Sequence, residues 1–129
     1  MTQISCVDLF CGAGGLTHGF VLEGVPVVAG IDMDPACRFP YEANNQARFV
    51  ERDISKVTIA ELKALFGDAD LTILAGCAPC QPFSTYAQRY ELDGKDGKWG
   101  LLYEFARLAK GSSPDVITME NVPTVAKHE

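Results

Sequence analysis

The sequence predicts an α/β fold in which a doubly wound, mostly parallel sheet is covered by helices on both faces. Short apolar segments typical of buried strands alternate along the chain with segments whose apolar residues recur at helical spacing. Strands joined by such helices pair in parallel through right-handed crossovers. The chain has 129 residues, of which 47% are hydrophobic, and this composition fits one globular domain with a single core.

Each expected element follows from the local pattern. Residues 4–10 form a continuous apolar run, and Pro35 stands where the first turn of a helix tolerates proline. The expected strands are 4–10, 25–31, 49–50, 71–75 and 116–119. The expected helices begin after the glycine-rich turn 12–15 and at 35, 58 and 100, and the last runs to about residue 110. Residues 77–97 are expected to be a long polar loop, with Gly94 and Gly97 as hinges.

Composition and charge exclude several classes of protein. The chain has no run of eighteen apolar residues, and residues 1–15 carry no Lys or Arg, so we expect a cytoplasmic protein without a membrane partner. Five cysteines are an odd number, which favours reduced thiols over a disulfide scaffold. The net charge of -6 repels phosphates, so binding to nucleic acid would need basic surface from elsewhere.

An acid or a thiol follows nearly every expected strand. These residues are Asp32, Asp53, Cys80 and Glu120, and Asp8 lies just before the first turn. Each alone has a structural explanation as a helix cap, a surface acid or a small buried side chain. Ligands of open α/β sheets bind at the carboxyl ends of the strands, so together these residues predict a site there.

The glycine-rich turn predicts a close approach of backbone to ligand. Gly12 and Gly14 permit a sharp turn, and Asp32 follows about twenty residues later, where a ribose-binding acid would stand. The third glycine of the dinucleotide fingerprint is absent, because Thr17 occupies its place. Gly12, Gly14 and Asp32 nevertheless keep a nicotinamide-dependent dehydrogenase open as an alternative.

Five motifs together resemble the cytosine-5 DNA methyltransferases. Over residues 4–125 they stand in the family's order as DLFCGAGGL, GIDMDP, RDI, GCAPCQPFS and MENV. The resemblance implies an S-adenosylmethionine-dependent methyltransferase fold of Rossmann-like type, incomplete at its C-terminal side. It also implies that residues 1–129 are the N-terminal part of the catalytic S-adenosylmethionine-binding domain, without the target-recognition domain. We therefore expect a missing C-terminal half or a second subunit as partner.

The same resemblance implies roles for individual residues. Cys80 is the implied nucleophile, and Glu120 is the acid that contacts the target base. The implied cofactor is S-adenosylmethionine, released as S-adenosylhomocysteine, and no metal is implied. Its implied contacts are Phe10, Gly12, Gly14, Asp32, Met33, Asp53 and Leu101. Residues implied to bind the base or position the loop are Pro79, Gln81, Ser84 and Asn121.

Three residues depart from the family's usual pattern. Cys77 and Ala78 replace residues that are more often Gly and Pro or Phe, which could alter the loop. Met33 stands where a bulkier side chain often lies under the adenine, which could weaken stacking.

The expected chemistry explains why these residue types are needed. A thiolate that adds to carbon 6 of cytosine makes carbon 5 nucleophilic, and a carboxylic acid at ring nitrogen 3 offsets the developing charge. Pro79 and Pro82 restrict the backbone on both sides of Cys80. The base must leave the duplex to be reached. DNA is the expected substrate, with transfer RNA as the alternative.

Two further alternatives use the cysteines. Cys77 and Cys80 form a C-x-x-C motif typical of redox dithiols, although Pro82 disfavours the helical start that thioredoxin-like proteins place there. A zinc site from Cys6, Cys11, Cys77 and Cys80 lacks a second pair at ligand spacing.

Overall fold

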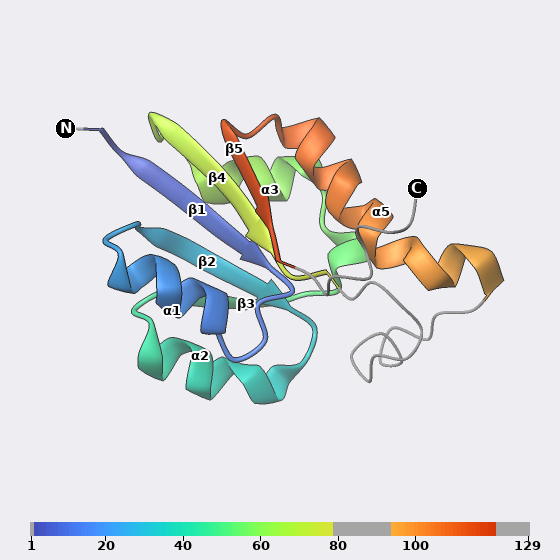
Figure 1. Cartoon of the computed structure of the whole chain (residues 1–129), viewed down its shortest axis with the longest axis horizontal. Helices are drawn as coiled ribbons and strands as arrows, with labels where there is room; N and C mark the ends of the chain where they lie inside the picture. Colours follow the sequence, from blue (N-terminus) through green and yellow to red (C-terminus); the bar gives the residue numbers. More distant parts are fainter. Residues whose placement is uncertain (1, 79–93, 121–129) are drawn as a thin grey trace.

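A parallel sheet forms the centre of the computed structural model, which describes residues 2–78 and 94–120, with side chains from residue 100 onward in the second range. Its strands lie in the order β3-β2-β1-β4-β5 (Figure 1). The strands are β1 (Ile4–Leu9), β2 (Val27–Asp32), β3 (Arg48–Glu51), β4 (Leu71–Gly76) and β5 (Val116–Met119). The helices are α1 (Gly15–Leu22), η1 (Pro35–Cys37), α2 (Arg38–Asn44), η2 (Ile54–Lys56), α3 (Ile59–Phe66) and α5 (Gly94–Ser112).

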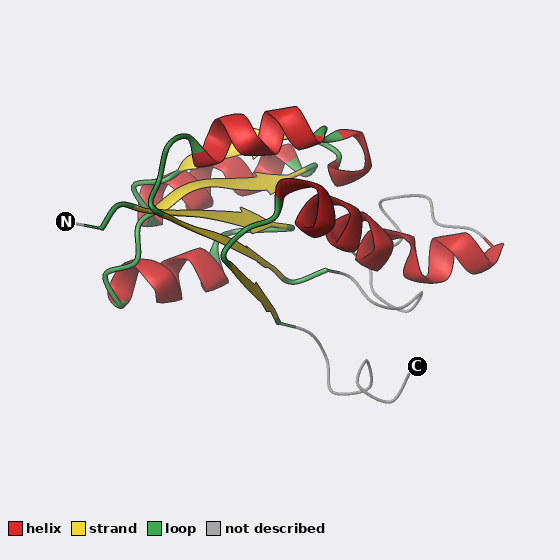
Figure 2. Cartoon of the chain, turned by 90° about the horizontal axis from the view of Figure 1, so that it is seen from above, coloured by secondary structure: helices red, strands yellow, loops and turns green. Residues whose placement is uncertain are grey.

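The strand order confirms the predicted doubly wound fold. The chain moves outward from β1 through β2 to β3, then returns to the other side of β1 with β4 and β5. All four pairings are parallel, and helices cover both faces of the sheet (Figure 2). The direction of winding reverses between β1 and β4, and in such sheets the ligand crevice lies at this reversal.

Alternation along the strands divides the core into two layers. Leu9 and Leu74 belong to the layer under α3 and α5, whereas Cys6 and Ile73 belong to the layer that includes residues of α1 and α2. This period of two is the pattern of strands buried on both faces. None of the described helices has the length and apolar character needed to cross a membrane.

The edge strand β5 differs from the central strands because its side chains are exposed. Val116, Ile117 and Met119 are 42%, 53% and 42% exposed, although β5 is fully paired with β4 on its other side. A flat edge strand with apolar side chains is a template for pairing with another chain. The β5 side of the sheet therefore exposes apolar side chains in the described structure.

One sequence assignment near this side of the sheet was wrong. The last helix was expected to begin at residue 100, but α5 begins at Gly94 and includes Gly97, so neither glycine is a loop hinge. Glycine inside a helix costs only about 1 kcal/mol relative to alanine. Burial of Leu101, Phe105 and Leu108 stabilises the helix. Because propagation of a formed helix has a small free-energy cost, the helix extends by a few more residues toward its N-terminus.

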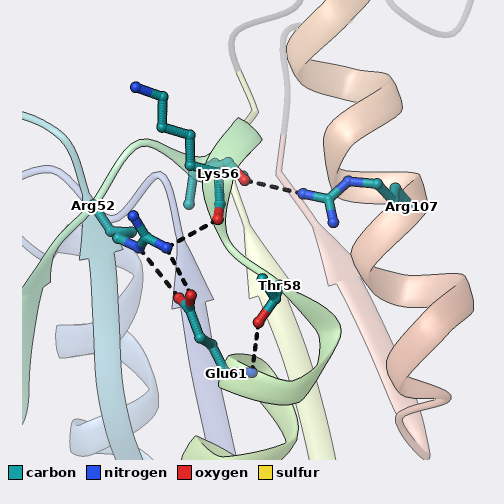
Figure 3. A network of polar contacts seen from close by, with 6 residues as sticks. Arg52, Lys56, Thr58, Glu61 and Arg107 are labelled. Atoms are coloured by element: carbon teal, nitrogen blue, oxygen red, sulfur yellow. Dashed lines mark hydrogen bonds and ion pairs between the residues drawn. The ribbon is translucent and has the colours of Figure 1, made fainter.

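A polar network fastens the segment between β3 and α3 (Figure 3). Arg52 donates from Nε and Nη2 to the two carboxylate oxygens of Glu61, at 3.2 and 2.6 Å, and from Nη2 to the Lys56 carbonyl at 3.0 Å. Thr58 caps α3, because its Oγ1 accepts the Glu61 amide at 3.0 Å. The start of α3 and the chain after β3 are thereby held in one arrangement.

Candidate functional site

The turn after β1 has three residues in the left-handed region of backbone space. Phe10 has φ of 56°, Gly12 of 54° and Gly14 of 98°. A non-glycine residue such as Phe10 in this region is uncommon, and such residues concentrate at functional sites. A Cβ atom added to Gly12 would meet no atom within 4 Å, so the outer side of the turn is open. The turn therefore presents backbone to the carboxyl edge of the sheet.

Asp32 ties this turn to the end of β2. Its Oδ2 accepts the Gly12 amide at 2.8 Å, and its Oδ1 accepts the Asp34 amide at 3.0 Å. The side chain is fully buried, and Met33 beside it is half-buried. Asp32 thus fixes the shape of the turn, and its contact with a ribose stays a prediction.

Asp53 lies after β3 at the same edge of the sheet. Its Oδ1 accepts the Ser55 amide at 2.9 Å and the Ser55 hydroxyl at 2.7 Å, which caps η2. Arg107 of α5 donates to the Ile54 carbonyl at 3.2 Å (Figure 3), and Leu101 is buried in the same core layer as Ile54. Helix α5 therefore supports the segment that carries Asp53.

Glu120 follows β5 and is exposed. Its amide donates to the Gly76 carbonyl at 2.9 Å, which extends the β4–β5 pairing to the residue itself. Glu120 also borders a shallow hollow beside α1. The other lining residues are Gly15, Leu16, Gly19, Phe20 and Glu23. Sequence reasoning missed this hollow, although the small residues Gly15 and Gly19 lie one helical turn apart and were a usable signal.

A buried polar cluster below the turn was also missed. Thr17 of α1 donates from Oγ1 to Asp8 Oδ2 at 2.6 Å, and the Tyr41 hydroxyl of α2 lies 2.9 Å from the same Oγ1. Burial raises the pKa of Asp8 to about 6, and the carboxylates of Asp32 and Glu120 add to the rise, while the hydrogen bond from Thr17 opposes it. The sequence offered Asp8 and Thr17 as separate residues and gave no signal for Tyr41.

We expect Asp8 to make stability depend on pH. Its pKa is about 6 in the folded chain and near 3.8 otherwise, so the folded state binds more protons between these values. The contribution of Asp8 to the free energy of unfolding is therefore largest below pH 3.8, where the carboxyl group is protonated, and is lost as the pH rises through 6. The total change is roughly 3 kcal/mol. Asp8→Asn removes this titration. The unfolding free energy of Asp8→Asn minus that of wild type should therefore increase by roughly 2 kcal/mol from pH 4 to pH 8.

Urea unfolding of both proteins at each pH measures this difference. A constant gap between wild type and Asp8→Asn across this range would show that Asp8 does not titrate as its surroundings require.

Five of the site residues named from the sequence lie outside the described residues, so the structure does not place them. They are Pro79, Cys80, Gln81, Ser84 and Asn121. The others lie near the carboxyl ends of the strands, except Leu101 on α5. Of the residues proposed for zinc, Cys6 and Cys11 are buried and Cys77 is exposed. No cluster of three potential metal ligands occurs within residues 2–78 and 94–120.

The architecture has a clear counterpart among solved structures. The Dnmt2 methyltransferase of S. pombe superposes with a TM-score of 0.70 at 22% identity, over 97% of this chain and 36% of that one. The likeness establishes the class of fold, that of the Rossmann-like methyltransferases, and the sheet order agrees with it.

Sequence comparison identifies the family. The sequence model of the C-5 cytosine-specific DNA methylases matches residues 4–129, so the chain belongs to this family. The Type II methylase M.HgiDII of Herpetosiphon aurantiacus is 54% identical over 119 residues, which are 92% of this chain and 33% of that protein. The Type II methyltransferase M.XorII of Xanthomonas oryzae is 36% identical over 99% of this chain and 31% of that protein. The chain thus spans about a third of the length of these relatives.

Proposed function

We propose that this chain supplies the cofactor-binding and catalytic part of an enzyme that methylates carbon 5 of cytosine in DNA. The family match over residues 4–129 carries the proposal. The arrangement at the carboxyl edge of the sheet supports it, because the open turn at Gly12, the acids Asp32 and Asp53, and Glu120 all lie there.

The residues at this edge fit S-adenosylmethionine. The space outside Gly12 admits a ligand against the backbone, and a side chain there would fill that space. Asp32 and Asp53 would accept hydrogen bonds from the ribose hydroxyls and the adenine amino group, and half-buried Met33 offers apolar surface to the adenine. Phe10 and Leu101 are buried, so they would support the adenine site from within the core. When bound, the cofactor supplies the electrophilic methyl group. Acids also suit its positive sulfonium charge.

Cys80 and Glu120 would carry out the reaction on the base. The Cys80 thiolate adds to carbon 6, while Glu120 donates a hydrogen bond or a proton at nitrogen 3 and so disperses the developing charge. Carbon 5 then takes the methyl group. Solvent water then takes the proton from carbon 5, and the electron pair of that C–H bond re-forms the double bond between carbons 5 and 6 and expels the Cys80 thiolate. The proton at nitrogen 3 returns to Glu120.

The rest of the enzyme would provide most contacts to DNA. The chain carries 11 Lys and Arg against 17 Asp and Glu, and phosphate contacts supply most non-specific affinity. Sequence readout needs side chains placed in a groove. We therefore propose that the region corresponding to the remainder of the relatives, on the same chain or on a second subunit, binds and selects the DNA.

A methyl-transfer assay tests this proposal. The chain is assayed alone and together with its downstream sequence, on mixed-sequence DNA and on transfer RNA, with S-adenosylmethionine labelled in the methyl group. We expect label in DNA only when both parts are present. Label in transfer RNA alone would favour the RNA alternative. Turnover by the chain alone would contradict its dependence on the remainder, and no turnover by the folded combination would contradict the methyltransferase function.

A further inference from the structure

Asp8, Thr17 and Tyr41 form a buried relay that joins three elements. Asp8 comes from β1, Thr17 from α1 and Tyr41 from α2, and each is at most 1% exposed. The Thr17 hydroxyl has one proton, which it donates to Asp8. The Tyr41 hydroxyl must then donate to Thr17 across their 2.9 Å separation. The relay therefore runs in one direction and ends on the Asp8 carboxyl group.

The ring of Tyr41 packs directly against the glycine-rich turn after β1. A Cβ atom on Gly14 would lie 2.7 Å from the ring, and one on Gly30 would lie 2.5 Å from both the ring and the hydroxyl. Gly30 is the neighbour of Asp8 in the β1–β2 register and comes two residues before Asp32. Tyr41 therefore contacts both the turn at Gly14 and the strand that carries Asp32.

The surroundings of Asp8 hold no compensating cation among its described neighbours. Its Oδ1 is buried without a hydrogen-bond partner in the described part of the chain. The titratable groups that interact with it are Cys6 of β1, Cys11 of the turn, Asp32 of β2, Tyr41 of α2 and Glu120 after β5. A buried carboxyl group with one unpaired oxygen is costly, and an apolar residue would avoid this cost. The raised pKa of Asp8 is consistent with this cost of burying its charge.

We propose that Asp8 is a positioning residue of the S-adenosylmethionine site, acting through Thr17 and Tyr41, and that the ionised relay is the form that favours the cofactor. This inference rests on the proposed function. Ionised Asp8 strengthens the hydrogen bond from Thr17, which holds the start of α1 and the turn in place. It also attracts a cofactor of net positive charge through a poorly solvated interior. Cofactor binding and ionisation of Asp8 are therefore linked.

The linkage has two measurable consequences. The affinity for S-adenosylmethionine should increase by about fivefold between pH 5 and pH 7, the result of a tenfold coupling to a group with a pKa near 6. Reciprocally, the cofactor should lower the pH at which the Asp8 carboxyl carbon titrates. Both are measured on the chain with its downstream sequence, by calorimetry and by carbon-13 NMR.

Variants separate this role from plain packing. Asp8→Asn should bind with an affinity that changes little with pH. Thr17→Val should raise the midpoint of the Asp8 titration, and Thr17→Ser should restore it. Ser5→Ala is the matched control, because Ser5 is another buried residue of β1 whose hydroxyl lacks a partner in the described structure. It should keep the wild-type pH profile.

The outcomes distinguish this inference from the proposed function. If wild type and Asp8→Asn both bind S-adenosylmethionine with the same pH profile, the positioning role is overturned and the proposed function stands. If the folded wild type binds no S-adenosylmethionine at any pH, the proposed function fails and this inference fails with it.

Discussion

Replacing Cys80 with alanine is expected to abolish covalent capture of DNA that contains 5-fluorocytosine. In the proposed mechanism the thiolate adds to carbon 6 and is expelled only when carbon 5 loses its proton. Fluorine at carbon 5 blocks that loss, so the wild-type enzyme should remain bound through Cys80 once the methyl group has been transferred. Alanine has no nucleophilic group, so the variant should also lose methyl transfer by about a thousandfold or more.

The neighbouring thiol provides the matched control. Cys77 lies three residues before Cys80 and is exposed. Cys77→Ser should keep both capture and methyl transfer. Mass spectrometry of the trapped protein, assembled with its downstream sequence, identifies the modified residue. An adduct on Cys77, or capture by Cys80→Ala, would contradict the assignment of the nucleophile.

Replacing Gly14 with alanine is expected to lower the free energy of unfolding by roughly 3 kcal/mol. Its φ of 98° is strained for any residue with a Cβ atom, at a cost of about 1–2 kcal/mol. The new Cβ would also lie 2.5 Å from Asn45 Nδ2 and 2.7 Å from the Tyr41 ring, and overpacking of this kind costs about 1–3 kcal/mol. Urea unfolding of the chain measures the loss.

Gly12→Ala is the control within the same turn. Gly12 has φ of 54°, but its Cβ would meet nothing within 4 Å. Its stability cost should be only about 1 kcal/mol. Since the added methyl group would fill the space proposed for S-adenosylmethionine, cofactor affinity should decrease by about tenfold or more. Equal stability losses in the two variants would show that Tyr41 and Asn45 yield to the new methyl group.

Much of the fold was predictable because its determinants are local. The β5 bounds at 116–119 match the expected strand, and the other strands agree within two residues, because each is a short apolar run between polar turns. The acids Asp32, Asp53 and Glu120 could be placed at one edge because parallel strands end on the same side. The start of α5 at Gly94 was missed because glycines usually indicate loops, whereas here the buried stripe farther along decides the helix.

The buried relay could not be predicted for a different reason. Thr17 and Tyr41 are 24 residues apart and meet only when α1 and α2 pack on the same face of the sheet. No local pattern distinguishes Tyr41 from another aromatic residue on the apolar side of a helix. Asp8 was noticed as an acid before the turn, but its burial depends on the strands and helices that surround it.

The fit of Tyr41 between Gly14 and Gly30 has a consequence for how this sequence can vary. The three positions share one volume, since a methyl group on either glycine would overlap the tyrosine ring. A side chain can be gained at position 30 only if the aromatic ring at position 41 is lost. In a large set of descendants selected for folding, alanine at 30 should therefore occur together with a small residue at 41, although the two positions are eleven apart in the chain.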